Sequence, residues 1–396
     1  MSLTGRKVVV IGAGIGGLAV ARALALRGAD VIVLEQAEAI REVGAGLQIS
    51  PNGFAVLRAL GLGEALRAVA VEGKAVCLRD YRGRDVLQLD ISKPGDGGHY
   101  FVHRADLIDL LAEGARAAGA RLRLLQKVAG ITPGPRPSLR MANGAVLGAD
   151  LVVGADGLHS VLRPAVDGVS EPFFTGQVAW RAVIPWEGQR AGQVHLHMGP
   201  HRHLVSYPLR GGRQMNIVAV QERAAWARAS WSQQDDPDTL RAAFADFGAD
   251  AQAMLARVDQ VNLWGLFRHP VAARWYGEGT VLLGDAAHPT LPFLAQGACL
   301  ALEDAWVLGD ALAAGGETDQ ARALASYQAR RKSRSSRVVR AAASNARKYH
   351  LGFPPLRWAA HTGLRLAGRL APGAMLRQFD WLYAHDVTGG ATKLLK

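Results

Sequence analysis

Four glycines near the N-terminus have the spacing of a dinucleotide-binding turn. Gly12, Gly14 and Gly17 match the pattern G-x-G-x-x-G, Gly16 lies in the same turn, and an apolar run precedes them. In such turns the first glycine permits a tight bend, the second lets the backbone approach a pyrophosphate, and the third lets a helix pack against a strand. The sequence around the glycines indicates both that strand and that helix. We therefore predict that this segment binds a dinucleotide.

Two carboxylates follow apolar runs that are typical of buried strands. Glu35 comes after the run at 31–34, where a carboxylate can accept hydrogen bonds from both ribose hydroxyls of an adenosine. Asp285 comes after the run at 281–283, close to the other end of the chain, where it could bind a sugar chain. These two stretches lie far apart in the sequence and would hold the two ends of one long cofactor. We therefore predict that the cofactor is FAD.

Composition limits the class of protein. The 396 residues are enough for two domains or for one large domain with an insertion. Contents of 49% hydrophobic and 20% charged residues are typical of a soluble globular protein. The two cysteines, Cys77 and Cys299, are too few for a disulfide framework, which favours a cytoplasmic location. The cysteines and histidines lack metal-ligand spacing, and no apolar run reaches about 18 residues. We therefore predict no metal and no transmembrane segment.

Much of the chain's net charge of +12 lies in one segment. Residues 321–350 contain nine Arg and Lys residues and no acid. Such a run attracts an anion such as a nucleic acid, an acidic membrane or a nicotinamide phosphate, or it is simply the solvated face of a helix. We favour the solvated face, and we predict no nucleic-acid partner because no aromatic residues alternate with the basic ones.

The order of predicted elements indicates an α/β fold with a discontinuous cofactor domain. Residues 6–35 have the pattern strand, turn, helix, strand, whereas residues 176–222 alternate like longer antiparallel strands with one wet face. We expect a Rossmann-like FAD domain of the glutathione-reductase type, an inserted mixed and largely antiparallel substrate sheet, and a helical C-terminal tail. The expected boundaries are 1–72, 98–172 and 270–340 for the FAD domain, 73–97 and 173–269 for the substrate domain, and 341–396 for the C-terminal segment.

Three motifs in order resemble those of the FAD-dependent aromatic hydroxylases, the single-component monooxygenases related to para-hydroxybenzoate hydroxylase. They are the glycine turn, Asp156-Gly157 followed by Ser160 and Arg163, and Gly284-Asp285 followed by His288-Pro289. Within that family the chain is most similar to the 3-hydroxybenzoate 6-hydroxylases and salicylate hydroxylases. The similarity lies in residues 43–48, 203–220, 294–305 and 380–383.

The resemblance implies how the cofactors bind. Glu35 would contact the adenosine ribose, Arg104 the middle of FAD, and Asp285 the ribityl chain. A helix N-terminus close to the flavin would favour negative charge on the reduced ring. No second dinucleotide fingerprint is present, and in this family NADH or NADPH binds only transiently. The remaining expected FAD contacts are Gln48, Gly297, Ala298 and Asp156, of which we expect Asp156 to fix a loop near the pyrophosphate rather than to take part in the chemistry.

The chemistry implied by the resemblance needs a base. NAD(P)H reduces the flavin, oxygen forms a C4a-hydroperoxide, and the ring of a phenol attacks it. A phenolate attacks better than a phenol, so a group of suitable pKa near the hydroxyl is useful. His203 is our candidate because Tyr207, four residues later, shares its face of one strand. His201 on the same face is a rival, and a merely structural histidine is the alternative.

Two further side chains each have two possible roles. Gln296 could hydrogen-bond the substrate or the oxygen adduct, or it could only shape its loop. Arg181 could pair with a substrate carboxylate, or it could be an exposed strand residue.

The expected function is hydroxylation of a small hydroxylated aromatic acid with molecular oxygen. Alternatives are a heteroaromatic such as 6-hydroxynicotinate, a larger secondary metabolite, a flavin dehydrogenase or oxidase, and an FAD-binding sensor. The sequence leaves a homodimer open.

Overall fold

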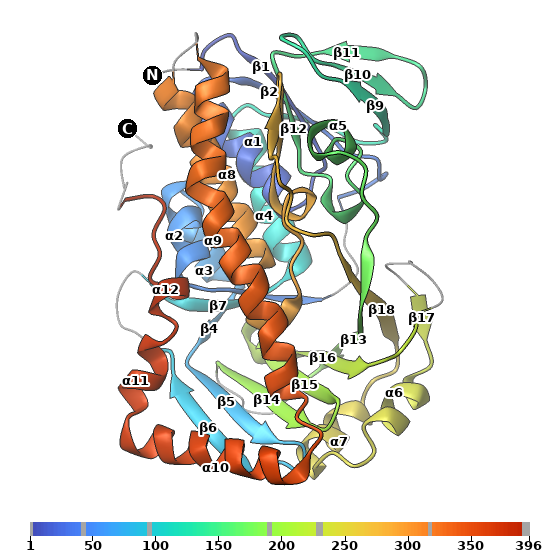
Figure 1. Cartoon of the computed structure of the whole chain (residues 1–396), viewed down its shortest axis with the longest axis vertical. Coiled ribbons are helices and arrows are strands. Elements are labelled where there is room, and N and C mark those ends of the chain that lie inside the picture. The colour runs from blue at the N-terminus through green and yellow to red at the C-terminus, as the bar shows by residue number, and fades with distance from the viewer. Residues whose placement is uncertain are drawn as a thin grey trace.

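The computed structural model describes residues 3–40, 45–92, 97–187, 192–226, 233–315 and 319–389. Val43 and Gly44, part of the stretch that resembles the hydroxylases, lie outside these ranges. Figure 1 shows two layered regions, one above the other, joined by a long helix that crosses both.

The upper region is built on a six-stranded sheet in the order β19-β20-β12-β1-β2-β8. Its central strands are parallel and consist of consecutive apolar residues, as a sheet buried on both faces requires. Helices pack on one side, and a small sheet of β9–β11 lies on the other (Figure 1). The strands are β1 (Lys7–Ile11), β2 (Asp30–Leu34), β8 (Arg121–Arg123), β9 (Val128–Thr132), β10 (Ser138–Met141), β11 (Val146–Gly148), β12 (Leu151–Gly154), β19 (Tyr276–Gly277) and β20 (Thr280–Leu282). The helices are α1 (Ile15–Ala25), α4 (Arg104–Ala117), η1 (Gly157–His159), α5 (Arg163–Asp167), η3 (Gly284–Ala286), η4 (Pro292–Leu294) and α8 (Gly297–Gly315).

The lower region is an eight-stranded sheet in the order β17-β18-β13-β16-β15-β14-β5-β6. Only the β14–β5 pair is parallel, so the sheet is mixed and largely antiparallel, as predicted. A core around Trp180 and Phe244 packs two short helices on one face. The elements are β5 (Ala75–Asp80), β6 (Asp85–Asp90), β13 (Phe173–Pro185), β14 (Gln193–Gly199), β15 (Arg202–Leu209), η2 (Arg210–Gly212), β16 (Gln214–Glu222), β17 (Gln233–Asp235), α6 (Pro237–Ala243), α7 (Ala249–Leu255) and β18 (Val261–Arg268).

A three-stranded sheet joins the two regions. Its strands β3 (Gly46–Ile49), β7 (His99–His103) and β4 (Val71–Gly73) lie near α2 (Pro51–Ala59) and α3 (Gly63–Val69). The backbone N–H of Gly46 donates to Asn216 Oδ1 on β16 at 2.6 Å. A Cβ at Gly46 would lie within 2.9 Å of both Tyr207 and Asn216. Glycine at this position therefore lets β3 approach the eight-stranded sheet.

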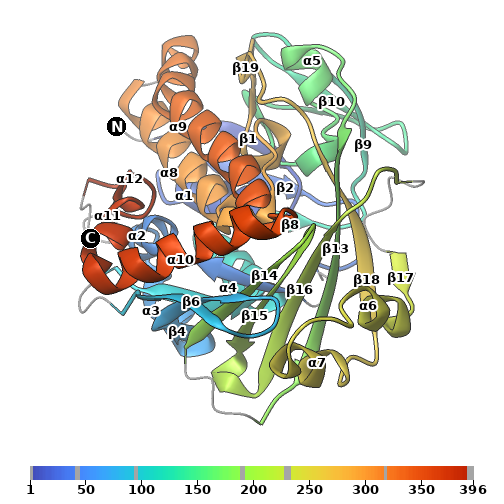
Figure 2. The same cartoon turned by 60° about the horizontal axis from the view of Figure 1, so that its bottom comes forward.

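Within the described ranges, four helices follow α8 and complete the fold. The 30-residue α9 (Gln320–Tyr349) runs from the upper region to β15, and α10 (Pro354–Leu370) then lies across the end of the lower sheet beside β6 (Figure 2). The last helices of the described ranges are α11 (Pro372–Arg377) and α12 (Asp380–Tyr383). None of the helices within the described ranges is long and apolar enough to cross a membrane.

The basic run on α9 is only partly a solvated face. Arg331 is fully buried, with Nε donating to Asp304 Oδ1 at 2.7 Å and Nη1 lying 2.5 Å from Glu303 Oε2. Arg334 also pairs with Glu303, at 2.8 Å. The prediction of a solvated face is therefore wrong for these two arginines. Adjacent acids on α8, distant in sequence, supply the opposite charge that makes their burial tolerable.

Candidate active site

A cavity of about 1090 Å³ lies where the upper and lower regions meet. Its walls come from the glycine turn, the loop after β20, the N-terminus of α8, the face of β15 and helices α9 to α12. Segments predicted to hold the cofactor and segments predicted to hold the substrate therefore open into one space. The predicted site residues in its walls are Gly14, Gly16, Gln48, Arg104, His203, Tyr207, Asp285, Gly297 and Ala298.

The glycine turn is packed against protein on one side and open on the other. Gly12 has φ +97°, and a Cβ there would lie 2.6 Å from the carbonyl oxygen of Ala155. A Cβ at Gly17 would lie 2.0 Å from the carbonyl oxygen of Gly12, whereas a Cβ at Gly14 would meet nothing within 4 Å. Gly14 also precedes α1 without a side-chain cap, which leaves helical N–H groups for an anion. This shape fits the pyrophosphate of a dinucleotide.

Glu35 holds its carboxylate beside this turn. One oxygen accepts the backbone N–H of Ala13 at 2.9 Å, and the other accepts that of Ala37 at the same distance. These bonds fix the carboxylate at the end of β2 without occupying all of its acceptor positions. The position fits the predicted contact with the adenosine ribose.

Charged groups lie where the middle of FAD would pass. Burial raises the pKa of the Asp285 carboxyl, while the charges of His288 and Arg104 act in the opposite direction. Burial lowers the pKa of Arg104 to about 10; nearby Arg181 adds to this and Asp285 opposes it. A carboxylate open to the cavity in this setting fits the hydroxyl donors of a ribityl chain.

The N-terminus of α8 faces the cavity through Gly297 and Ala298. Ala295, just before it, adopts the left-handed conformation with φ +52°, which turns the chain into the helix. The positive end of this 19-residue helix therefore points at the space between the two regions. It fits a flavin ring that becomes negatively charged on reduction.

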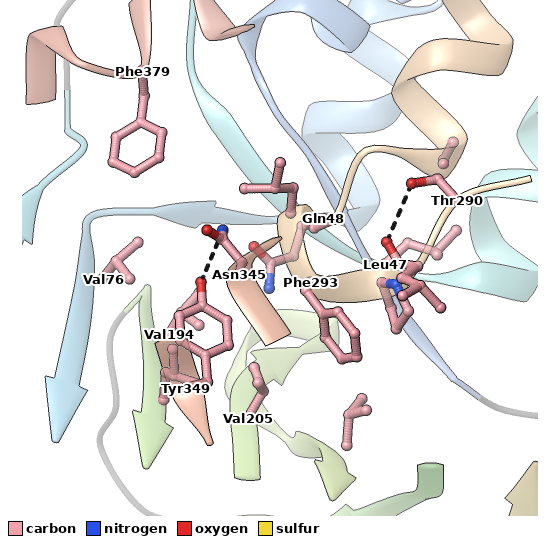
Figure 3. Close-up of a pocket in the computed structure, with 18 of the residues that line it drawn as sticks. Leu47, Gln48, Val76, Val194, Val205, Thr290, Phe293, Asn345, Tyr349 and Phe379 are labelled. Carbon is pink, nitrogen blue, oxygen red and sulfur yellow. Dashed lines mark hydrogen bonds between the residues drawn. The ribbon is translucent and has the colours of Figure 1, made fainter. Parts of the chain in front are cut away.

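Asp156 and Gln48 occupy different positions. Asp156 Oδ2 accepts the backbone N–H of Val161 at 2.7 Å, which fixes the loop after β12. Gln48, on β3, points into the cavity near Asn345 and Phe293 (Figure 3). The geometry therefore favours a loop-fixing role for Asp156 and a position facing the ligand for Gln48.

His203 and Tyr207 share one face of β15, as their spacing predicts, and both line the cavity. Their residues are 2% and 4% exposed. Burial and then the neighbouring His350 hold the pKa of His203 well below its ordinary value. Burial raises the pKa of Tyr207, against the effects of Arg181 and a hydrogen bond with Asn216.

The rival His201 lies elsewhere. It occupies the turn before β15 with φ +61°, and its side chain is 68% exposed and bound to Glu222 at 2.7 Å. It does not belong to the cavity wall, because the turn rotates its side chain away from the strand face. Of the two histidines, only His203 is placed to meet a ligand.

Gln296 points away from the cavity. Its Nε2 donates to Ser50 Oγ at 2.8 Å, and its Oε1 accepts from Asn52 Nδ2 at 3.0 Å. Asn52 also donates to Glu303, so the amide belongs to the buried polar cluster beneath α8. This arrangement favours the interpretation in which Gln296 shapes its loop.

Sequence reasoning missed several residues of the site. Tyr349 and Asn345 of α9 reach the cavity beside Phe293 (Figure 3). His350, just after that helix, contacts His203. No local motif marks these residues, because the long α9 brings them to β15 only in the folded chain. Arg181, for which we left two interpretations, lines the cavity next to Tyr207.

The fold and this geometry agree with known proteins. The FAD binding domain family matches residues 6–342. The chain is 33% identical over 395 residues to 3-amino-4-hydroxybenzoate 2-monooxygenase PtmB3 of Streptomyces platensis, covering 96% of each. It is 35% identical over 358 residues to 3-hydroxybenzoate 6-hydroxylase of Klebsiella oxytoca, covering 87% of this chain and 89% of the relative.

A solved structure is similar over nearly the whole fold. Klebsiella pneumoniae HpxO, in complex with FAD and uric acid, superposes with a TM-score of 0.83 at 26% identity, covering 96% of this chain and 98% of HpxO. The glycine turn, the Asp285 loop and the α8 N-terminus fit the positions predicted for them around FAD. The chain therefore belongs to the FAD-binding-domain family, as one of its FAD-dependent aromatic monooxygenases.

Proposed function

We propose that this enzyme uses NAD(P)H and molecular oxygen to hydroxylate a small hydroxylated aromatic acid, with His203 as the general base. The observation that carries the proposal is the shared cavity. His203 and Tyr207 face the same space as Asp285 and the N-terminus of α8. The proposal assigns the substrate to the sheet segments 73–97 and 173–269 and FAD to 1–72, 98–172 and 270–340.

The cofactor side supplies binding and orientation. Gly14 and the start of α1 hold the pyrophosphate, Glu35 the adenosine ribose and Asp285 the ribityl chain. The start of α8 stabilises negative charge on the ring. Bound FAD, once reduced by the nicotinamide cofactor, supplies activated oxygen for transfer to the ring of the substrate.

The substrate side supplies a base in an apolar wall. His203 accepts the proton of the substrate hydroxyl, which makes the ring carbon a better nucleophile. Tyr207 is four residues away on the same face and can hydrogen-bond that oxygen. Val194, Val205 and Phe293 line the same cavity with apolar side chains, which favour the exclusion of water (Figure 3).

Arg181 supports an acidic substrate. It lines the cavity, its guanidinium stacks over Trp264 with 5.2 Å from Cζ to the ring centroid, and its buried Nε has no hydrogen-bond partner. Within the described ranges it has no ion-pair partner. A cation in a protein-lined cavity is stabilised by an anion, and a substrate carboxylate would provide it.

A larger aromatic substrate is the second candidate. The cavity continues beyond His203 between β5–β6 and α10–α11, and most of its walls there are apolar. A hydroxybenzoate alone would leave this extension to water. The residues that favour the larger ligand are Leu78, Leu87, Leu89, Leu364 and Met375.

A substrate screen tests the proposal. FAD-loaded enzyme is mixed with NADH or NADPH and a panel of hydroxybenzoates, aminohydroxybenzoates, hydroxynicotinates and alkyl-substituted phenols. We expect at least one acid to accelerate NAD(P)H oxidation and yield a hydroxylated product with little peroxide. Stimulated oxidation that yields only peroxide from every compound would instead identify an oxidase.

A further inference from the structure

A continuous chain of hydrogen-bonding side chains leads from the cavity to the surface. His203 Nδ1 lies 2.6 Å from His350 Nε2, and His350 Nδ1 lies 2.9 Å from Glu222 Oε1. The other oxygen of Glu222 lies 2.7 Å from His201 Nδ1. His203 and His350 are buried, whereas the Glu222 side chain is 39% exposed. The chain therefore spans the wall between the site and solvent.

Backbone bonds hold the three segments of this chain together. His201 N–H donates to the carbonyl oxygen of His350 at 3.2 Å, and Glu222 N–H donates to that of His201 at 2.9 Å. Gly352 provides room for the turn, because a Cβ there would lie 2.6 Å from His201 Nε2. The turn before β15, the end of β16 and the end of α9 are thus locked to one another.

The chemistry of Glu222 determines where the protons of the chain lie. An ionised carboxylate only accepts hydrogen bonds, so His350 must carry its proton on Nδ1. His350 Nε2 is then an acceptor, which places the proton of His203 on Nδ1. The remaining nitrogen, His203 Nε2, keeps a lone pair for the cavity, which is the tautomer that a base requires.

We propose that Glu222 and His350 set the tautomer of His203 and carry the substrate proton to solvent. The inference rests on the proposed role of His203 as the base. The substrate hydroxyl gives its proton to His203 Nε2, and the Nδ1 proton of His203 passes to His350 Nε2. The Nδ1 proton of His350 passes to Glu222, which releases it to water. One proton enters and one leaves, so both rings stay neutral but hold their protons on Nε2. When the product oxygen takes a proton back from His203 Nε2, the same shifts run in reverse and restore the resting tautomers.

The surroundings of His203 make such an exit necessary. Its neighbours on the adjacent strands, Met198 and Val220, are apolar, and Phe293 and Tyr349 pack edge-on against its ring. The titratable groups near it are Tyr207 on its own strand, and Tyr349 and His350 at the end of α9. A proton held on His203 would therefore be a buried charge without a carboxylate in contact.

Nitrogen NMR of the FAD-loaded enzyme labelled with ¹⁵N-histidine tests the tautomers and needs no substrate. Signals are assigned by their loss in His203→Gln and His350→Gln. We expect both rings to be neutral with the proton on Nδ1 near neutral pH. A proton on Nε2 of His203 in the wild-type enzyme would overturn the inference.

Stopped-flow absorbance with 3-hydroxy-4-nitrobenzoate, whose phenolate is coloured, tests the proton path. Glu222→Gln should slow phenolate formation by about tenfold or more, and Glu222→Asp should restore much of the rate. Asp246→Asn is the matched control, since Asp246 pairs with Arg202 beside the chain without belonging to it. We expect that variant to behave like wild type.

The variants separate the two proposals. If His203→Gln forms phenolate at the wild-type rate, His203 is not the base and the proposed function fails at that point. If His203→Gln loses phenolate formation while Glu222→Gln and His350→Gln keep the wild-type rate, His203 remains the base and the relay is refuted.

Discussion

The proposed cofactor groove and the proposed substrate face of the same cavity are built in different ways. On the cofactor side, the backbone atoms of short motifs shape the groove, as at Gly12, Gly14 and Gly17. On the substrate side, side chains from β15 and the end of α9 meet across 147 residues of sequence, as His203 and His350 do. Binding of a constant cofactor can depend on local backbone shape, whereas recognition of a particular substrate depends on tertiary contacts.

The largest expected effect is at the closed side of the glycine turn. Gly17→Val should lower the free energy of unfolding by more than about 4 kcal/mol or prevent folding, because the Cβ of the new residue would overlap the carbonyl oxygen of Gly12. Gly14→Ala is the matched control: it meets no protein atom, so its melting temperature should stay near wild type while FAD binding weakens. Thermal unfolding and flavin content measure both. Equal melting temperatures would contradict the assignment of a closed and an open side.

The buried ion cluster between α8 and α9 should give the next effect. Arg331→Met leaves Glu303 and Asp304 short of positive charge and should lower the free energy of unfolding by about 3–5 kcal/mol. Arg330→Met removes only an exposed pair with Asp310 and should cost about 0–1 kcal/mol. Denaturant unfolding compares the two, and a similar loss in both would show that burial is not what matters.

A substitution on the proposed substrate face should impair hydroxylation without impairing FAD binding or flavin reduction. His203→Gln should lower the rate of product formation by about 10²-fold while FAD affinity and flavin reduction persist. Peroxide release should rise as oxygen is used without transfer. Product analysis together with peroxide measurement checks this, and unchanged coupling would exclude His203 as the base.

The pH dependence should sharpen the same assignment. Burial holds the pKa of His203 well below its ordinary value of 6.5, so the ring stays neutral as the pH falls through that value. Coupled hydroxylation should therefore decline only at a lower pH, when His203 becomes protonated. A pH profile of kcat/KM for product would contradict this if its acid limb lay at or above pH 6.5.

Arg181 should show the smallest and most selective effect. Arg181→Gln removes the cation proposed to meet the substrate carboxylate, so KM for an aromatic acid should rise about tenfold or more. A phenol without a carboxylate should be affected far less. Steady-state kinetics with a matched pair of such substrates measures the difference, and equal changes for both would argue against a carboxylate contact.

The sequence predicts one side of the cavity better than the other for a physical reason. The glycine turn and the strands around it are local, so their spacing alone indicates the structure. The shared face of His203 and Tyr207 also follows from a strand period of two. The direction of Gln296 depends on Ser50 and Asn52, and the pairing of His350 depends on where a 30-residue helix ends. Such contacts exist only after folding.

The burial of Arg331 has the same origin. Its run of basic residues resembles a solvated face because the acids that neutralise it lie on α8, in another part of the sequence. Sequence spacing on α9 gives no sign of them. Charge patterns therefore need the packing of neighbouring helices before they can be interpreted.

Oxygen labelling tests the central claim most directly. FAD-loaded enzyme is supplied with NAD(P)H, an aromatic acid that stimulates it, and ¹⁸O₂, and the product is analysed by mass spectrometry. The account predicts one ¹⁸O atom in the new hydroxyl group of each product molecule. Product without the label, or label found only in peroxide and water, would contradict it.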